Sequence, residues 1–165
     1  MALNITPSNG APRPQRSHRF TERTLAEVAA AIETLDEAGK AGGTYRYRNV
    51  RFDASGSVLS LDLDVQLVLR MPVWAHYAGR PQAERDEWDR FYHALRYHED
   101  GHLRVTRTEV AAMYQALLGA TEDTIDAVFG EEEQRIKDEH DAYDDRTDHG
   151  LTQQTPHGTT VIQVP

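Results

Sequence analysis

The chain has 165 residues, of which 39% are hydrophobic and 27% are charged, a size and composition that predict one globular domain. Its 18 lysines and arginines stand against 27 aspartates and glutamates, and this net charge of −9 argues against a nucleic-acid partner. The lack of cysteine excludes disulfides, thiol nucleophiles and thiolate metal ligands, so a metal ion would need histidine, aspartate or glutamate. The sequence as written shows neither a membrane span nor a secretory signal, which predicts a cytoplasmic protein without a membrane partner.

The N-terminal half is predicted to contain a tail, a helix and a hairpin. Residues 1–17 carry three prolines among serine, asparagine, glycine and arginine, so we expect a flexible, proline-rich tail. Apolar residues at steps of three and four predict an amphipathic helix within Thr21–Gly39. The β-prone segment Thr44–Phe52 precedes turn residues at 53–57, and leucine and valine then alternate with mostly polar residues over Leu59–Leu69. This alternation predicts a hairpin with one buried face.

The C-terminal half is predicted to be mostly helical, because residues 82–155 contain no proline. A stripe of aromatic, aliphatic and histidine side chains predicts one long helix over Ala83–Leu118. Shorter helices are expected at 121–129 and 131–143, and residues 154–165 are expected to form a C-terminal tail.

These elements together predict the fold class α+β. We expect an N-terminal helix, a small antiparallel sheet of two to four strands, and a long helix followed by shorter helices. Residues 18–153 are expected to form a single domain.

The middle of the predicted long helix carries the motif H-E-x-x-H, as His98-Glu99-Asp100-Gly101-His102. Two histidines four positions apart share a helix face and lie ~6 Å apart along its axis, so both can bind one tetrahedral ion. Glu99 lies one step further round the helix, where its carboxylate can take a proton from an activated water and pass it to a leaving amine. The motif therefore indicates a metallohydrolase. The alternative interpretation is two buried core histidines that bind no metal.

The residues alone leave the third protein ligand of such a site open. The longer motif with a third histidine on the same helix is excluded, because Val105 and Thr108 occupy its glycine and histidine positions. Glu109 lies on the same face but ~10 Å beyond His102. His149 stands in a turn-like setting before a glycine, from which it could reach back to the helix. Its alternative is a solvated loop histidine.

Several blocks of the sequence resemble a bacterial family of predicted zinc-dependent proteases, the domain of unknown function 922. They occur in the family's order and spacing over residues 43–153. The blocks are Met71-Pro-Val-Trp74, Glu87-Trp-Asp-Arg-Phe91, Ala94-Leu-Arg-Tyr-His-Glu-Asp-Gly-His102 and Tyr143-Asp-Asp-Arg-Thr-Asp-His-Gly150. The resemblance implies that His98 and His102 are metal ligands, that Glu99 is the general base, and that His149 is the third ligand.

The resemblance also points to two further residues of the last block. Tyr143 is expected to donate a hydrogen bond in the transition state, and Asp144 to orient an imidazole ligand. The alternatives are a packed aromatic at a helix end for Tyr143 and a turn cap for Asp144. The chain departs from the family where relatives carry a Gln-Gly pair, because it has Gln153-Gln154. Many relatives are also described as secreted, whereas this sequence shows no leader.

The predicted function is that of a zinc metallopeptidase with one Zn²⁺ per chain, in which zinc-bound water attacks a peptide bond with the help of Glu99. A peptide or protein is the expected substrate, and this expectation comes from the resemblance. One alternative is a zinc hydrolase of a small amide or acyl compound. The other is a non-catalytic binding module in which zinc only ties the loop of His149 to the helix. Cobalt, nickel or manganese would suit the same ligands, and the sequence predicts no oligomeric state.

Overall fold

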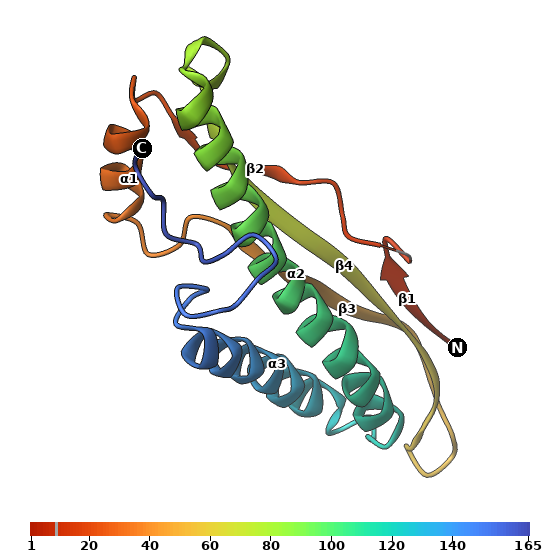
Figure 1. Ribbon diagram of the computed structural model, residues 1–165. Coiled ribbons are helices and arrows are strands. Elements are labelled where there is room, and N and C mark those ends of the chain that lie inside the picture. Colours follow the sequence, from red (N-terminus) through yellow and green to blue (C-terminus); the bar gives the residue numbers. More distant parts are fainter. Residues whose placement is uncertain (9) are drawn as a thin grey trace. The chain divides into compact units, whose positions relative to one another are not determined.

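The computed structural model describes residues 1–8 and 10–165, and Figure 1 shows its helices and strands. The elements are, in chain order, β1 (Ala2–Thr6), β2 (Gln15–Phe20), α1 (Leu25–Ile32), β3 (Lys40–Phe52), β4 (Val58–Trp74), the 3-10 helix η1 (Tyr77–Gly79), α2 (Gln82–Leu118) and α3 (Ile125–Thr147). In the described part of the chain, none of the helices has both the length and the apolar character needed to cross a membrane.

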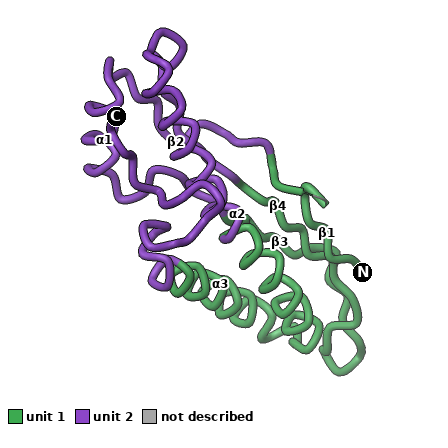
Figure 2. Tube along the Cα trace, in the orientation of Figure 1, with its two compact units in different colours: residues 1–12, 42–68, 102–143 green, residues 13–41, 69–101, 144–165 purple. Residues whose placement is uncertain are grey.

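The chain divides into two compact units, each assembled from three separate segments and coloured in Figure 2. Unit 1 consists of residues 1–12, 42–68 and 102–143, and unit 2 of residues 13–41, 69–101 and 144–165.

The sheet has four strands, and its antiparallel character was wrongly predicted. β1 and β2 both run parallel to β4, with pairing from Ala2 opposite Asp62 in β1 and from Gln15 opposite Arg70 in β2. β3 also pairs with β4, to which the turn at residues 53–57 joins it. Both parallel partners come from the first 20 residues, most of which were expected to form a flexible tail. Their pairing with β4 is remote in sequence and therefore leaves no local pattern to read.

Unit 1 is built around the alternating residues of β4. Its buried apolar side chains come from β4, from the C-terminal half of α2 and from α3, and include Leu61, Leu63, Val65, Leu67, Val110, Met113, Leu117, Ile125 and Ile136. Arg135 of α3 forms ion pairs with Glu132 and with Glu109 of α2. α3 is one continuous helix, whereas two shorter helices were predicted on either side of Gly130. The buried apolar residues of α3 and these ion pairs offset the free-energy cost of ~1 kcal/mol for a glycine inside a helix.

Unit 2 has an aromatic-rich core that combines β2, α1, the end of β4 and the N-terminal half of α2. The core consists of Phe20, Leu25, Val28, Leu69, Met71, Trp74, Trp88, Phe91 and Leu95. α1 begins with a capping box, in which the Thr24 hydroxyl accepts a hydrogen bond from the Glu27 N–H and the Glu27 carboxylate accepts one from the Thr24 N–H. α1 ends at Ile32, whereas the prediction extended as far as Gly39. Residues 33–39 instead form a loop that runs toward α2. This loop brings Gly39 next to the H-E-x-x-H motif.

α2 runs from Gln82 to Leu118, as predicted to within one residue, and it carries the motif near its middle. The C-terminal residues 154–165 form no helix or strand. They nevertheless pack onto the core of unit 2, to which they belong, because Thr160 is buried and Ile162 contacts the apolar core.

Candidate metal centre

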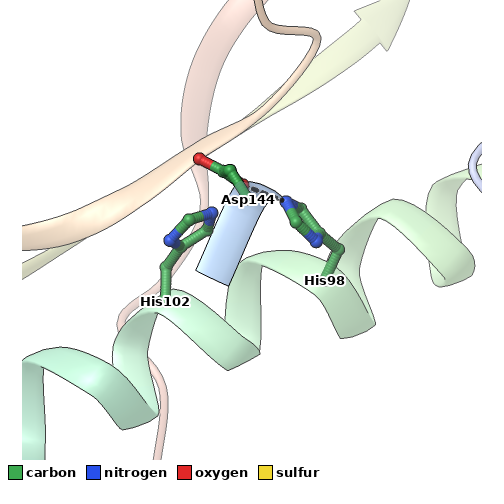
Figure 3. A group of neighbouring side chains, drawn as sticks. All are labelled: His98, His102 and Asp144. Atoms are coloured by element: carbon green, nitrogen blue, oxygen red, sulfur yellow. Dashed lines mark ion pairs between the residues drawn. The ribbon is translucent and has the colours of Figure 1, made fainter. Parts of the chain in front are cut away.

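Three side chains that can bind a metal ion lie together: His98, His102 and Asp144 (Figure 3). Each offers one ligand atom, and these atoms all lie within 4.8 Å of one another. Both histidines are buried and lie one turn apart on α2, as the motif predicts, and Asp144 lies near the end of α3. Two imidazole nitrogens and one carboxylate oxygen form the protein ligand set of many catalytic zinc sites. The three residues therefore could hold a metal ion.

His98 is held from two sides within unit 2. Its Nε2 lies 3.1 Å from Oδ1 of Asp144, and its Nδ1 lies 3.2 Å from Oε1 of Gln153. The backbone of Gly150 packs against the ring, because a Cβ at this position would lie 3.2 Å from Cγ of His98. Since Nδ1 faces the amide oxygen, Nε2 is the atom of His98 that can bind a metal ion.

His102 is the start of a chain of polar contacts within unit 1. Its Nδ1 lies 2.8 Å from Nδ1 of His140, and Nε2 of His140 lies 3.1 Å from Oγ1 of Thr106. One of the two facing Nδ1 atoms must carry a proton and the other must accept it. When His102 binds a cation through Nε2, its Nδ1–H donates to His140, whose own Nε2–H donates to Thr106. Tyr143 also contacts His102, with the two rings edge to face and their centroids 4.9 Å apart.

Glu99 is buried, and its Oε2 has no hydrogen-bond partner among the described residues. Burial raises the pKa of Glu99 to about 8, and the negative charges of Glu37 and Asp144 act in the same direction. The carboxylate packs against the backbone of Gly39, where a Cβ would come within 2.5 Å of Oε1. A buried acid with an unsatisfied oxygen is costly for stability, and groups of this kind are concentrated at functional sites.

The last motif block forms the C-terminal turn of α3. Asp148, His149 and Gly150 all have positive φ angles, and the N–H of His149 bonds back to the carbonyl of Asp144. His149, the predicted third ligand, lies with its Nδ1 3.8 Å from Oδ1 of Asp144, and its side chain is 63% exposed. The group of ligand atoms within 4.8 Å contains Asp144 and does not contain His149. The structure therefore brings His149 beside the group through Asp144, the residue that sequence reasoning expected to orient a ligand.

Two further residues contact His98 and His102, namely Gln153 and His140. Sequence reasoning considered His140 only as one of several candidate third ligands and gave Gln153 no role at the site. A signal for His140 exists, because it precedes Asp144 by four positions and therefore shares its face of α3. Gln153 lies beyond the helix in a stretch without periodicity. No pattern in the sequence connects it with His98.

Comparison with known families matches residues 15–150 of the chain to DUF922, described as a bacterial protein of unknown function. The match covers most of the chain, which therefore belongs to this family. Searches among curated proteins and among solved structures found no match.

Proposed function

We propose that this protein is a zinc-dependent hydrolase and that its substrate is a peptide bond. The observation that carries the proposal is the buried carboxylate of Glu99, with one oxygen that no described residue satisfies. It lies on α2 directly after the ligand His98, in the position that the motif assigns to a general base. A structural carboxylate in the same place would be expected to have a hydrogen-bond partner for each oxygen.

In this proposal His98, His102 and Asp144 hold the ion. Asp144 replaces His149 as the third ligand, because it is the residue that lies within 4.8 Å of both imidazoles. His149 then serves to orient the Asp144 carboxylate from the solvent side, at 3.8 Å. The roles that the sequence suggested for these two residues are thus exchanged.

A bound zinc ion supplies a Lewis acid that polarises the scissile carbonyl and lowers the pKa of a water molecule. Glu99 accepts the proton of the attacking water at Oε2 and then delivers it to the leaving amine. A cation bound beside Glu99 would favour the carboxylate form and so lower its pKa from about 8, which would let it act as a base at neutral pH. Tyr143, beside His102, would donate a hydrogen bond to the developing oxyanion.

The choice of a peptide substrate rests on the likeness of the motif blocks to predicted zinc proteases. A hydrolase of a small amide or acyl compound would use the same residues in the same roles. A panel that contains unstructured proteins, short peptides and simple amides and esters separates the two substrate classes.

The test combines zinc content with hydrolysis for a small set of variants. We expect wild type to hold about one zinc per chain and to cleave a member of the panel. Glu99→Gln should retain zinc and lose activity by about 10²–10⁴-fold, because only the proton transfer is removed. Asp144→Ala should lose zinc, whereas His149→Ala should keep most of it. Asp100→Asn, a neighbouring carboxylate paired with Arg96, is the matched control and should change neither property.

Two results would overturn the proposal. Wild type that binds no zinc under chelator-free conditions excludes the metal site. Glu99→Gln that cleaves at the wild-type rate excludes Glu99 as the base, and an unchanged partner-binding property in that variant would then favour a binding module. A reversed result for Asp144→Ala and His149→Ala would return the third ligand to His149.

A further inference from the structure

Residues 151–163, called here the C-terminal clamp, are attached to α2 mainly through Arg90. Arg90 donates hydrogen bonds to three carbonyl oxygens of the clamp, those of His157, Thr159 and Val161. Its remaining donors go to the carboxylate of Glu87 on the same helix. All five N–H groups of the guanidinium are therefore engaged, which fixes its plane and position. Glu87 adds a further contact, because its Oε1 accepts the N–H of Gln163 at 2.6 Å.

The other end of the clamp reaches the candidate metal centre. Oε1 of Gln153 lies 3.2 Å from Nδ1 of His98. Thr160 packs onto Gly150. A Cβ added to Gly150 would lie 2.8 Å from Cγ2 of Thr160 and 3.2 Å from Cγ of His98. The ring of His98 thus lies against the glycine backbone while its outer nitrogen faces Gln153. Thr160 is itself buried, which shows that this contact is packed.

We propose that Gln153 is a positioning residue for His98, and that Arg90 holds it in place at a distance through the C-terminal clamp. The proposal rests on the metal site proposed above. A histidine that binds a metal through Nε2 carries its proton on Nδ1, and an oxygen acceptor at Nδ1 fixes both this tautomer and the ring plane. The amide oxygen of Gln153 is such an acceptor, and it lies on the side of the ring away from Asp144. Removing an orienting partner of this kind typically costs 10–100-fold in metal affinity.

The role of Arg90 follows from geometry along the helix. Arg90 precedes His98 by eight residues on α2, which places it ~12 Å away along the helix axis, too far to touch the ligand atoms. Its influence on His98 must therefore pass through the clamp. Loss of the guanidinium releases the three carbonyl oxygens together and loosens the segment that carries Gln153.

The experiment measures the Zn²⁺ affinity of full-length protein by competition with a chromophoric chelator. Gln153→Ala should bind Zn²⁺ 10–100-fold more weakly than wild type, and Gln153→Glu should recover the loss because a carboxylate also accepts the Nδ1 proton. Gln154→Ala is the matched control, since this neighbouring glutamine is exposed, and it should bind as wild type does. Arg90→Ala should weaken binding, whereas Arg85→Ala should not, because the hydrogen bonds of the Arg85 guanidinium go to Ala78 and Gln82, outside the clamp. The double variant Arg90→Ala/Gln153→Ala should bind no more weakly than Gln153→Ala alone.

A second readout separates orientation from a general loss of structure. In protein loaded with Co²⁺, the Nδ1 proton of a ligand histidine gives a shifted NMR signal that exchanges slowly when it is hydrogen bonded. This exchange should be faster in Gln153→Ala than in Gln154→Ala. Unchanged affinity and exchange in Gln153→Ala, with wild type that binds zinc, would overturn this inference and leave the proposed function standing. Fully additive losses in the double variant would remove the link to Arg90, and wild type that binds no zinc would overturn the proposed function itself.

Discussion

Glu99 combines burial with an oxygen that no described residue satisfies, and this combination has a consequence for stability. In the metal-free protein its pKa of about 8 lies above the value of 4.5 expected in the unfolded chain. The folded state then holds the proton more tightly, so the stabilising contribution is complete below pH 4.5 and is lost as the pH rises toward 8. We expect the free energy of unfolding to fall over this window by up to about 1.4 kcal/mol per pH unit.

Glu99→Gln tests this dependence, because glutamine resembles the protonated acid and cannot ionise. Urea unfolding at pH 5, 6, 7 and 8, with a chelator present, should show that the variant becomes progressively more stable than wild type. Asp86→Asn, which changes an exposed carboxylate on the same helix, should follow the wild-type profile. Parallel profiles for Glu99→Gln and wild type would show that Glu99 is ionised in the folded metal-free protein.

His140 gives a second prediction, at the other proposed ligand, His102. Because its Nδ1 lies 2.8 Å from that of His102, replacing His140 by alanine removes the acceptor that fixes the ring of His102. We expect His140→Ala to lower Zn²⁺ affinity 10–100-fold, and Thr106→Val to lower it less, since Thr106 acts only through His140. His76, an exposed histidine that follows β4, is the control for loss of an imidazole. Equal affinities of His140→Ala and His76→Ala would exclude the orienting role.

The common position of His98 and His102 on one helix face was predictable, whereas the residues that contact them were not. The spacing of His98 and His102 determines their common face through helix geometry alone. The contact of His98 with Gln153 depends on where a nonrepetitive segment runs, and this is decided by the clamp contacts to Arg90 and Glu87. The resemblance identified the block that contains Asp144 and His149. It did not determine which of the two lies close to both His98 and His102, because this also depends on the path of the chain after α3.

At the scale of elements, β4 has one buried and one exposed face, and its leucines test this directly. Leu63 is fully buried, whereas Leu59 on the same strand is 60% exposed. Leu63→Ala should reduce the free energy of unfolding by about 2–5 kcal/mol, because it leaves a cavity in the core of unit 1. Leu59→Ala should change it by less than about 0.5 kcal/mol. Chemical denaturation of both variants measures the difference, and similar losses would contradict the strand's orientation.

The periodicity of apolar residues and the local composition predicted where helices and strands occur better than they predicted which strands pair. The alternation of apolar residues in β4 and the stripe along α2 are local patterns, and both elements lie where these patterns occur. The parallel pairing of β1 and β2 with β4 has no such pattern, because the paired residues lie more than 50 positions apart. Gly130 was predicted to end a helix, but α3 continues through it. The packing and ion pairs of α3 outweigh the free-energy cost of about 1 kcal/mol for a glycine inside a helix.

At the scale of the whole molecule, the proposed metal binding would be linked to folding. The proposed ligands come from two helices that are remote in sequence, so the unfolded chain offers no comparable site, and zinc should stabilise the folded state. At a free zinc concentration 100-fold above the dissociation constant, the gain is about 2.7 kcal/mol, which raises the Tm of a chain of this size by about 5–10 °C. Calorimetry with added zinc should show this rise, and a chelator should reverse it. His98→Ala, which removes a ligand, should show no rise, and a rise of equal size in that variant would place the stabilising zinc at another position.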